Sequence, residues 1–487
     1  MSELQQLKPK IIWHYFDEIL QIPRPSKHEE KMIAYLKNFA ESAALKYHID
    51  KVGNVIIQKP ATPGMENRKT VILQAHMDMV PQKATGSTHN FKTDPIQAYI
   101  DGEWVKANKT TLGADNGIGI AAVLAILISN DLTHGQLEAL FTVDEETGMT
   151  GAFGLEPNIL HGNILLNLDS EEDGHLYIGC AGMSDTKIEF TYTEQPASQH
   201  SAALLITIDG LKGGHSGIDI NKNRGNAAKI MAMILWNLNK KYNNVSLATI
   251  EAGTPVHNAI PRRAIATVVT SQENIHAITT DIANMAKDIA VIYQTTDPKL
   301  HITTEPAKTP TTLIDNKIKN DLINALYGCP HGVIRMDDNI PNFVSTSSNL
   351  AYVKSENGKI DIFTSQRSNN EFEQKEIVNT VKNIFELVNA KVMKCSSYPG
   401  ALPDVNAPIV QLTKDVYEKL FHKEPEVAAI HAGLEFGILR RNYPDLEIIS
   451  FGPTILYAHS PDECVKIATV DPFWKLLTEL LKVIPKK

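Results

Sequence analysis

The chain has little of what would make it a disulfide scaffold or a membrane protein. Its 487 residues include only four cysteines, which lie far apart at positions 180, 329, 395 and 464. No CxxC pair is present, which argues against a zinc ribbon and against a disulfide framework. No stretch approaches the roughly 18–20 uninterrupted apolar residues of a membrane span, and the N-terminal residues lack an apolar signal region. These absences predict a cytoplasmic protein with no membrane partner.

Long basic runs and phosphate-binding loops are absent too. The chain has 47 Lys and Arg against 56 Asp and Glu, a formal net charge of -9, so a nucleic-acid partner is not expected. The glycines at 113–119 do not have the GxGxxG spacing of a dinucleotide loop, and Ser216 does not have the GxSxG spacing of a serine hydrolase. With 43% hydrophobic residues, the composition is that of a globular protein with ample material for a core.

The sequence does contain apolar strands alternating with helices, at both ends of the chain. Strands are predicted at 54–58, 70–75, 137–143 and 164–168, and after residue 408 the pattern returns with a strand at 447–451 and a helix at 473–484. This alternation predicts an α/β fold, with a mixed sheet flanked by helices. Residues 187–399 mix strands of alternating polarity with apolar helices, which predicts a separate α+β domain. We therefore expect a catalytic domain in two parts, 1–186 and 400–487, interrupted by an inserted domain at 187–399.

The N-terminal segment carries helix signals of its own. Apolar residues from 11 to 20 recur at helical spacing, and Pro23 and Pro25 end that helix. Ser26 and Glu29 have the spacing of a capping box, which predicts that a second helix opens there.

Acidic residues and histidines gather where the apolar strands end. Ligands of α/β sheets collect at the carboxyl ends of strands, and a mixture of imidazole and carboxylate suits Zn²⁺ or a similar divalent ion. The residues in question are His76, Asp78, Asp115, Glu145, Glu146, Asp169 and, much later, His459.

Five ligands with one shared carboxylate would hold two metal ions roughly 3.5–4 Å apart. Asp115 is the best candidate for the shared ligand, because it lies in a glycine-flanked loop where the backbone bends easily. Asp78 is placed to orient His76. Glu145 is placed to take a proton from a metal-bound water and to deliver it to a leaving amine.

Each motif has a commoner structural interpretation when it is taken alone. A His-x-Asp pair near a strand end is more often structural, residues 144–146 suit a solvated turn, and residues 115–117 are an ordinary turn signal. Asp169 with the acids after it suits a helix cap. The metal-centre hypothesis depends on these motifs occurring together, in order, and at strand ends. Zinc is the expected metal, although cobalt and manganese also suit the ligand set.

These motifs resemble, nearly end to end, those of the dizinc carboxypeptidase–aminoacylase–dipeptidase family, and within it the aminoacyl-histidine dipeptidases. The stretches that carry the resemblance are LQAHMDMV at 73–80, TLGADNG at 111–117, DEETGM at 144–149, LNLDSEE at 166–172, GLKGGHSG at 210–217, HAGLE at 431–435, and GPT at 452–454 with HSPDE at 459–463. The resemblance implies a zinc-peptidase catalytic domain with an inserted lid domain. It also favours a homodimer, with the alternative that the large lid supplies every site residue within one chain.

The resemblance further implies a role for each candidate residue. One zinc ion would be held by His76 and Asp169, and the other by Glu146 and His459, with Asp115 bridging them. Glu145 would be the general base and acid, and Asp78 would orient His76. In the inserted domain, His215 resembles the lid histidine that stabilises the oxyanion. Four further residues are expected to bind substrate, the first two at its carboxylate and the last two at its amino end: Asn258, Arg367, His431 and Glu435.

The function implied is metal-dependent hydrolysis of unblocked dipeptides, including Xaa-His dipeptides such as carnosine. The alternative within the same class is an aminoacylase or amidohydrolase that acts on N-acyl amino acids, and a non-catalytic binding descendant is the alternative outside it. Residues 218–221 and Ala401 depart from the family pattern, in or beside the expected lid. The departures put the substrate preference in doubt and leave the metal ligands intact.

Overall fold

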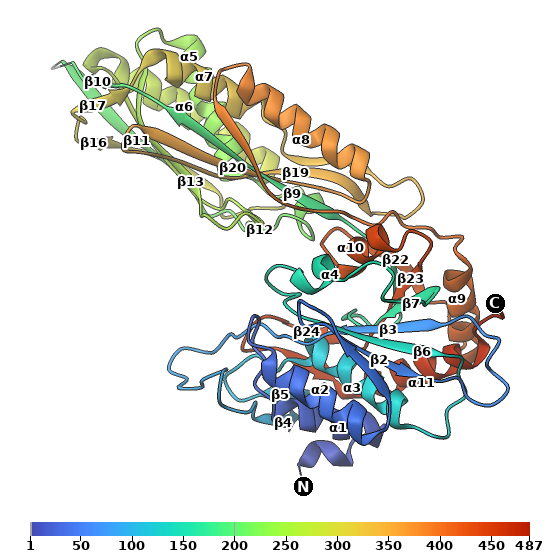
Figure 1. Cartoon of the computed structure of the whole chain (residues 1–487). Coiled ribbons are helices and arrows are strands. Elements are labelled where there is room, and N and C mark those ends of the chain that lie inside the picture. The colour runs from blue at the N-terminus through green and yellow to red at the C-terminus, as the bar shows by residue number, and fades with distance from the viewer. Residues whose placement is uncertain (1, 199) are drawn as a thin grey trace. The chain divides into compact units, whose positions relative to one another are not determined.

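The computed structural model describes residues 2–198 and 200–487 (Figure 1). The chain forms two compact units. The first comprises the residues up to Gly179 together with Ala401–Ala429 and Leu434–Lys487, and the second comprises Cys180–Gly400 with Ile430–Gly433. The domain boundaries expected at 186/187 and 399/400, and the role of the inserted part as a lid, stay predictions.

The first unit is built on an eight-stranded sheet in the described part of the chain. Its four central strands, β6, β3, β7 and β23, run parallel, while β2 pairs antiparallel with β6, β1 with β2, and β8 with β23. Every residue of β3 and β6 is buried, which explains why both strands are mostly apolar in the sequence. In sheet order the strands are β1 (Lys46–Ile49), β2 (Val55–Lys59), β6 (Leu137–Thr142), β3 (Val71–His76), β7 (Ile164–Asn167), β23 (Glu447–Ser450), β8 (His175–Cys180) and β22 (Glu426–Ile430).

Helices cover both faces of this sheet. Figure 1 shows α1, α3 and α11 on one side and α4 and α10 on the other. Helix α3 packs on β3 and on α1 and is apolar on all sides, as expected of a helix inside the core. The helices are η1 (Glu3–Gln6), α1 (Lys10–Leu20), α2 (Glu30–Ser42), α3 (Ala114–Ile128), α4 (Thr150–Gly154), α9 (Pro408–Phe421), α10 (Glu435–Asn442) and α11 (Ile467–Val483). A small antiparallel sheet completes the unit, in the order β24 (Ile455–Leu456), β25 (Cys464–Lys466), β5 (Trp104–Ala107) and β4 (Ala98–Asp101).

The capping box predicted at the start of α2 is wrong. The Ser26 hydroxyl donates to the carbonyl of Met79, and no side chain caps the helix. The Glu29 carboxylate instead accepts the N–H groups of Lys27, at 2.9 Å, and of Asp144, at 3.0 Å. The spacing of Ser26 and Glu29 is that of a cap, but the tertiary partner of Glu29 is a turn at the end of β6.

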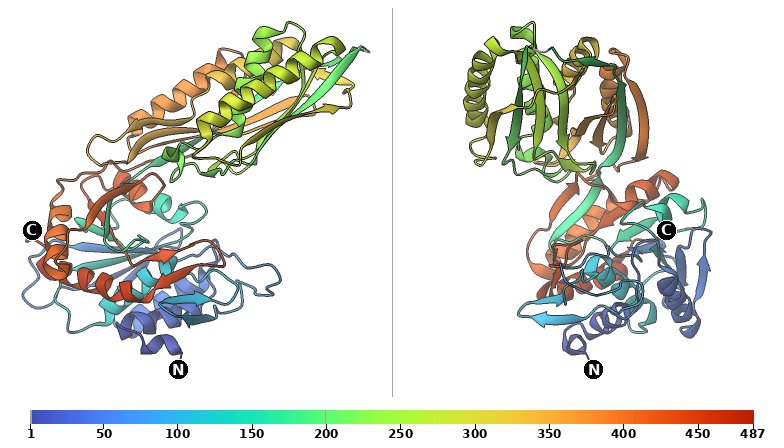
Figure 2. Two further views of the ribbon diagram at one scale, coloured as in Figure 1. Left: turned by 180° about the vertical axis from the view of Figure 1, so that it is seen from behind. Right: turned by 90° about the vertical axis from the view of Figure 1, so that its left-hand side faces the viewer.

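The second unit is an antiparallel sheet with helices on one face (Figure 2). Its strands, in sheet order, are β16 (His301–Ala307), β11 (Ser201–Asp209), β15 (Ala264–Ser271), β13 (Ser246–Gly253), β19 (Val344–Glu356), β20 (Lys359–Ser368), β9 (Gly182–Thr191) and β21 (Lys391–Tyr398), with β18 (Gly332–Met336) beside β19. Its helices are η2 (Ile220–Lys222), α5 (Ala227–Lys241), η3 (Gln272–Asn274), α6 (Ile275–Tyr293), α7 (Asn316–Gly328) and α8 (Glu371–Glu386). Two short pairs accompany them, β10 (Glu194–Pro196) with β17 (Thr312–Ile314), and β12 (Gly214–His215) with β14 (Ala259–Ile260).

The predicted fold class, α/β with a mixed sheet flanked by helices, is confirmed by this architecture. None of the helices in the described ranges is long and apolar enough to cross a membrane.

Candidate dinuclear metal centre and substrate-binding residues

The carboxyl ends of the central parallel strands bring the candidate metal ligands to one edge of the first unit's sheet. His76 is the last residue of β3, Glu145 and Glu146 follow β6, and Asp169 follows β7. Because these three strands are parallel neighbours, their ends meet at the same edge. Asp115 lies at the start of α3, and His459 lies in the loop between β24 and β25.

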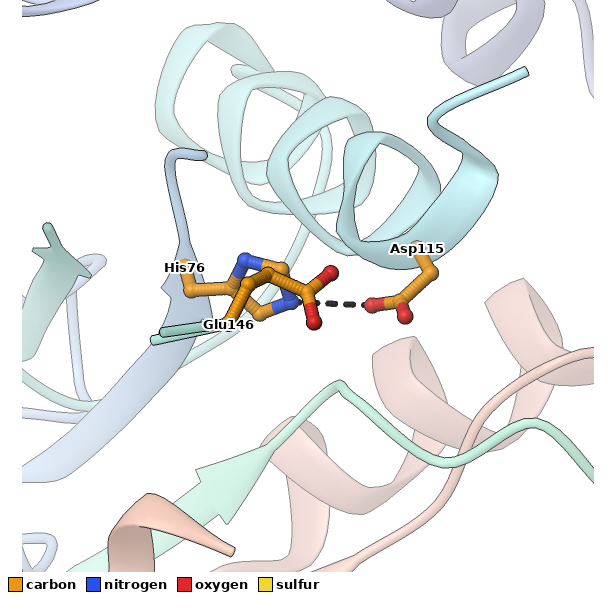
Figure 3. Close-up of side chains that lie close together, drawn as sticks. All are labelled: His76, Asp115 and Glu146. Atoms are coloured by element: carbon orange, nitrogen blue, oxygen red, sulfur yellow. Dashed lines mark hydrogen bonds and ion pairs between the residues drawn. The ribbon is translucent and has the colours of Figure 1, made fainter. Parts of the chain in front are cut away.

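Two imidazoles at this edge share one carboxylate. Nε2 of His76 lies 2.8 Å from Oδ1 of Asp115 and 3.2 Å from Oδ1 of Asp169. Nε2 of His459 lies 3.0 Å from Oδ2 of Asp115 and 2.9 Å from Oε2 of Glu146. Each oxygen of Asp115 therefore faces one imidazole, and each imidazole has a second carboxylate of its own. Figure 3 shows His76 and Asp115 with Glu146 beside them, the three residues whose ligand atoms lie within 4.8 Å of one another.

Asp78 contacts both a candidate ligand and the turn that carries the two glutamates. Its Oδ1 lies 3.3 Å from Nδ1 of His76, the ring nitrogen that points away from Asp115. The same carboxylate accepts the backbone N–H of Glu145 at 3.0 Å and that of Glu146 at 3.2 Å. Asp78 is completely buried. One carboxylate thus holds the turn of the two glutamates through two hydrogen bonds and faces the His76 ring, which is where a residue that orients His76 is expected.

Glu145 sits on a tight turn that other side chains hold in place. Asp144 has a positive φ of 54°, and its carboxylate accepts the hydroxyls of Thr147 and Thr150. Burial raises the pKa of Glu145 well above its usual range, and the nearby Asp169 and Glu146 carboxylates raise it further against the effect of His76. A carboxyl with a raised pKa is suited to accept and release a proton near neutral pH.

The residues at this edge fit divalent cations. Oε1 of Glu146 is buried and has no hydrogen-bond partner in residues 2–198 and 200–487, an arrangement that is costly unless a ligand satisfies it. Burial alone would lower the pKa of His76 and of His459, but the adjoining carboxylates outweigh it: the pKa of His76 lies well above the usual value, and that of His459 rises to about 11. The centre therefore stabilises positive charge at the two imidazole nitrogens where the hypothesis puts metal ions.

A second group of predicted residues lies within the second unit. The short pair β12 and β14 sets His215 opposite Ala259, and the carbonyl of Asn258 accepts the N–H of Ser216 at 2.7 Å. Arg367 on β20 is 3% exposed, and its Nε is buried without a hydrogen-bond partner. No carboxylate pairs with the Arg367 guanidinium anywhere in the described part of the chain, where its Nη1 reaches only the Tyr398 hydroxyl, at 3.5 Å.

The histidines near Arg367 are kept neutral. Burial and then the Arg367 charge lower the pKa of His215 to about 4 and that of His431 to about 3. Nε2 of His431 is paired with the Ser347 hydroxyl at 2.7 Å. A buried guanidinium beside two neutral imidazoles is a site for an anion, because an unpaired buried charge is strongly unfavourable.

Glu435 lies in the first unit, at the start of α10, among polar side chains of the central strands. Its Oε2 accepts hydrogen bonds from Nε2 of Gln74 at 2.6 Å and from the Thr142 hydroxyl at 2.5 Å, whereas its Oε1 is buried without a partner among the described residues. Burial raises the pKa of Glu435 to about 8. His431 belongs to the second unit.

Three buried residues near the centre were not anticipated as functional: Arg24, Glu29 and Glu463. All three bond to backbone groups of the loops that carry the ligands. For Glu463 the sequence did hold a signal, since it ends the HSPDE stretch that begins with His459. Arg24 and Glu29 lie far from every ligand in the sequence and have no such signal.

Fold and site together define an α/β metallopeptidase with the ligand set of a dinuclear centre. The family model described as "Peptidase family M20/M25/M40" matches residues 72–483. The chain belongs to this peptidase family.

Relatives of full length agree with this assignment. The chain is 41% identical over 487 residues to the cytosol non-specific dipeptidase of Escherichia coli (strain K12), with 100% of both chains covered. It superimposes on the aminoacylhistidine dipeptidase of Vibrio alginolyticus with a TM-score of 0.93 and 42% identity, covering 100% of this chain and 99% of that one. Aminopeptidase PepT of Bacillus cereus shares the fold at 15% identity, with a TM-score of 0.57 and 98% of each chain covered. The predicted family is confirmed, and with it the prediction of a metal-dependent hydrolase.

Proposed function

We propose that this protein is a metal-dependent dipeptidase that hydrolyses unblocked dipeptides, including Xaa-His dipeptides such as carnosine. One observation carries the proposal: at the carboxyl edge of the sheet, the imidazoles of His76 and His459 each face one oxygen of the Asp115 carboxylate. The two relatives of full length, which are named as a non-specific dipeptidase and an aminoacylhistidine dipeptidase, support the substrate class.

The resident ions are proposed to be two zinc ions, since imidazole and carboxylate are suitable zinc ligands and cobalt or manganese would also bind. His76 and Asp169 would hold one ion, Glu146 and His459 would hold the other, and Asp115 would contact both. When bound, such ions polarise the substrate carbonyl and activate a water molecule.

Glu145 is proposed to move the proton. Its carboxylate would accept a proton from the attacking water and then donate it to the nitrogen of the leaving amine, a role that its raised pKa supports. Asp78 would keep Glu145 in place through the backbone N–H that it accepts at 3.0 Å. This contact is additional to its support of His76.

Arg367 is proposed to bind the substrate carboxylate. A guanidinium forms paired hydrogen bonds with a carboxylate, and the Arg367 guanidinium has no carboxylate partner within the described ranges. Asn258 would add an amide donor. His215, neutral because its pKa is lowered to about 4, would donate its ring N–H to the oxyanion that develops at the scissile carbonyl.

The amino end of the substrate is assigned to Glu435, whose buried Oε1 has no partner among the described residues. An ammonium group satisfies such an oxygen. His431 was expected beside it, and that part of the prediction stays untested. A requirement for a free amine would separate this protein from the rival aminoacylase, which acts on N-acyl amino acids.

The test is an activity assay on metal-stripped protein before and after addition of Zn²⁺, Mn²⁺ or Co²⁺. We expect restored cleavage of Ala-Ala, Gly-His and carnosine, and slow turnover of Ala-Ala-Ala and of N-acetylalanine. Preference for N-acetylalanine would establish the aminoacylase instead. A Glu145→Ala variant that keeps its metal and loses turnover would reject the non-catalytic alternative.

A cytoplasmic location and a homodimer are proposed as well. The location is supported by the relative named as a cytosol dipeptidase. The dimer rests on family analogy alone, and sedimentation of the purified protein would test it.

A further inference from the structure

Residues 112–115, which we call the bridge loop, carry Asp115 and are held from two sides by buried charged side chains. These side chains are Glu463, at 2% exposed, and Arg24, also at 2% exposed. Neither offers an atom to the proposed metal ions, and the hydrogen bonds of both go to the backbone of ligand-bearing segments.

Glu463 accepts the backbone N–H of every residue of the bridge loop. Its Oε2 accepts from Leu112 at 2.8 Å and Gly113 at 3.0 Å, and its Oε1 accepts from Ala114 at 2.8 Å and Asp115 at 3.3 Å. The bridge loop precedes the regular turns of α3, because Asp115 and Asn116 have non-helical backbone angles, and Glu463 satisfies the N–H groups of this irregular segment. Glu463 follows His459 by four residues, so the segment that supplies the His459 imidazole also fixes the loop of Asp115.

Arg24 makes the corresponding connection on the side of His76. Its Nη1 donates to the carbonyls of Met77 at 3.0 Å and Asp78 at 2.6 Å, and its Nη2 donates to the carbonyl of Gly113 at 2.5 Å. The guanidinium therefore ties the end of β3 to the bridge loop. Gly113 is required there, because it has a φ of 72° and a Cβ would lie 2.8 Å from Nη2 of Arg24.

We propose that Arg24 and Glu463 are positioning residues that hold Asp115 where its two oxygens serve both metal ions. Arg24 fixes the bridge loop relative to the His76 half of the centre, and Glu463 fixes it relative to the His459 half. The inference rests on the proposed two-metal function, because a bridging role for Asp115 has meaning only if two ions bind.

The proposal predicts a specific defect in metal binding. A Glu463→Gln variant places an amide N–H₂ against two backbone N–H donors, so that part of the bridge loop must move away. An Arg24→Lys variant keeps the positive charge but cannot span three carbonyls with a single ammonium group. In both variants each ion would still find an imidazole and a carboxylate of its own, but an Asp115 that is no longer fixed would serve the first ion at the expense of the second.

The experiment is titration of the metal-free full-length protein with Co²⁺, followed by calorimetry and by the visible absorption spectrum. Wild type should bind two equivalents. In Glu463→Gln and Arg24→Lys we expect the affinity for the second equivalent to fall by about 10- to 100-fold, which is typical of lost support behind a metal ligand. The first equivalent should change less, and the spectrum of the two-cobalt form should change.

A matched control separates positioning from general loosening. Glu138, at the opposite end of β6, is also a buried carboxylate that accepts two backbone N–H groups, those of His161 at 2.8 Å and Gly162 at 2.9 Å. Glu138→Gln removes a buried carboxylate at a distance from the candidate ligands and should leave both Co²⁺ affinities and the spectrum unchanged.

The outcomes distinguish this inference from the proposed function. If wild type binds fewer than two Co²⁺ ions, the two-metal function itself fails. If wild type binds two ions and the variants bind both with wild-type affinity and spectrum, only the positioning role fails. An equal loss in Glu138→Gln would also overturn it. Should Glu463→Gln not fold, Glu463→Asp applies the same test, since it keeps both acceptor oxygens and sets them back by one methylene.

Discussion

Replacing Arg367 by methionine should leave the protein as stable as before and remove most of its activity. The Arg367 guanidinium is 3% exposed and has no carboxylate partner within the described ranges. Replacing a buried charge by an apolar side chain of similar size is often neutral or stabilising. We therefore expect the free energy of unfolding of the Arg367→Met variant, measured in urea, to equal or exceed that of wild type.

The loss of activity follows from the carboxylate that Arg367 is proposed to bind. Breaking a desolvated ion pair by removing one partner costs about 3–5 kcal/mol, which corresponds to roughly a 100- to 4,000-fold fall in kcat/KM for Ala-Ala. With alanyl-alaninamide, which has no carboxylate, the same substitution should have little effect. Wild type should thus discriminate strongly between the two substrates, and the variant should not.

The control is Arg335→Met, which removes an exposed arginine of the same unit that pairs with Glu373 at 2.5 Å and Asp338 at 2.9 Å. It should leave kcat/KM for both substrates near wild type. Equal losses on Ala-Ala and its amide in Arg367→Met would refute the assignment, because they would show that Arg367 does not act through the carboxylate. A large drop in stability would refute the claim that the charge is uncompensated.

The remaining predictions concern proton transfer, the support of the metal centre and pH. Glu145→Gln should lower kcat by about 10²- to 10⁴-fold, the usual contribution of a general base, with an unchanged metal content by elemental analysis; loss of metal would give Glu145 a ligand role instead. Asp78→Asn should lower metal affinity in calorimetry by about 10- to 100-fold, because an amide cannot accept both N–H groups of the 145–146 turn; wild-type affinity would contradict this. Burial and the Arg367 charge lower the pKa of His215 from the ordinary value of 6.5 to about 4. Between pH 6.5 and about 4 the unfolded chain therefore binds more protons than the folded protein, and the free energy of unfolding falls as the pH drops through this range. His215→Gln should flatten this slope in urea unfolding at stepped pH, and an unchanged slope would count against it.

The central architecture was predictable because burial leaves a pattern in the sequence. The strand predicted at 70–75 is β3 (Val71–His76), and that at 164–168 is β7 (Ile164–Asn167). Parallel strands buried on both faces are mostly apolar, and the polar residues within them or at their ends must have a partner. This is why the sequence pattern is sufficient to place His76 and Asp169 at one edge of a sheet.

The support of the metal centre was not predictable, because it acts on the backbone. Glu463 and Arg24 bond to N–H and C=O groups that every residue possesses, so no residue type in the bridge loop marks their presence. The hydrogen bonds of Glu29 also go to the backbone, and here the sequence suggests the wrong partner. Its distance from Ser26 matches a helix cap, and only the approach of Asp144 from a distant turn reveals its actual partner.

The buried acids around the centre divide into two kinds, and their hydrogen bonds tell them apart. Asp115 and Asp169 direct carboxylate oxygens at an imidazole nitrogen, within 2.8 Å and 3.2 Å respectively. Asp78 and Glu463 instead accept backbone N–H groups of the loops that carry other candidate ligands. A carboxylate whose oxygens are engaged by backbone N–H groups is a weak candidate for a ligand, since binding a metal would break bonds that hold the ligand loops. Composition alone treats all four as equivalent acids, whereas their contacts set two against the imidazoles, as the proposed ligands, and two against the backbone of the loops around them.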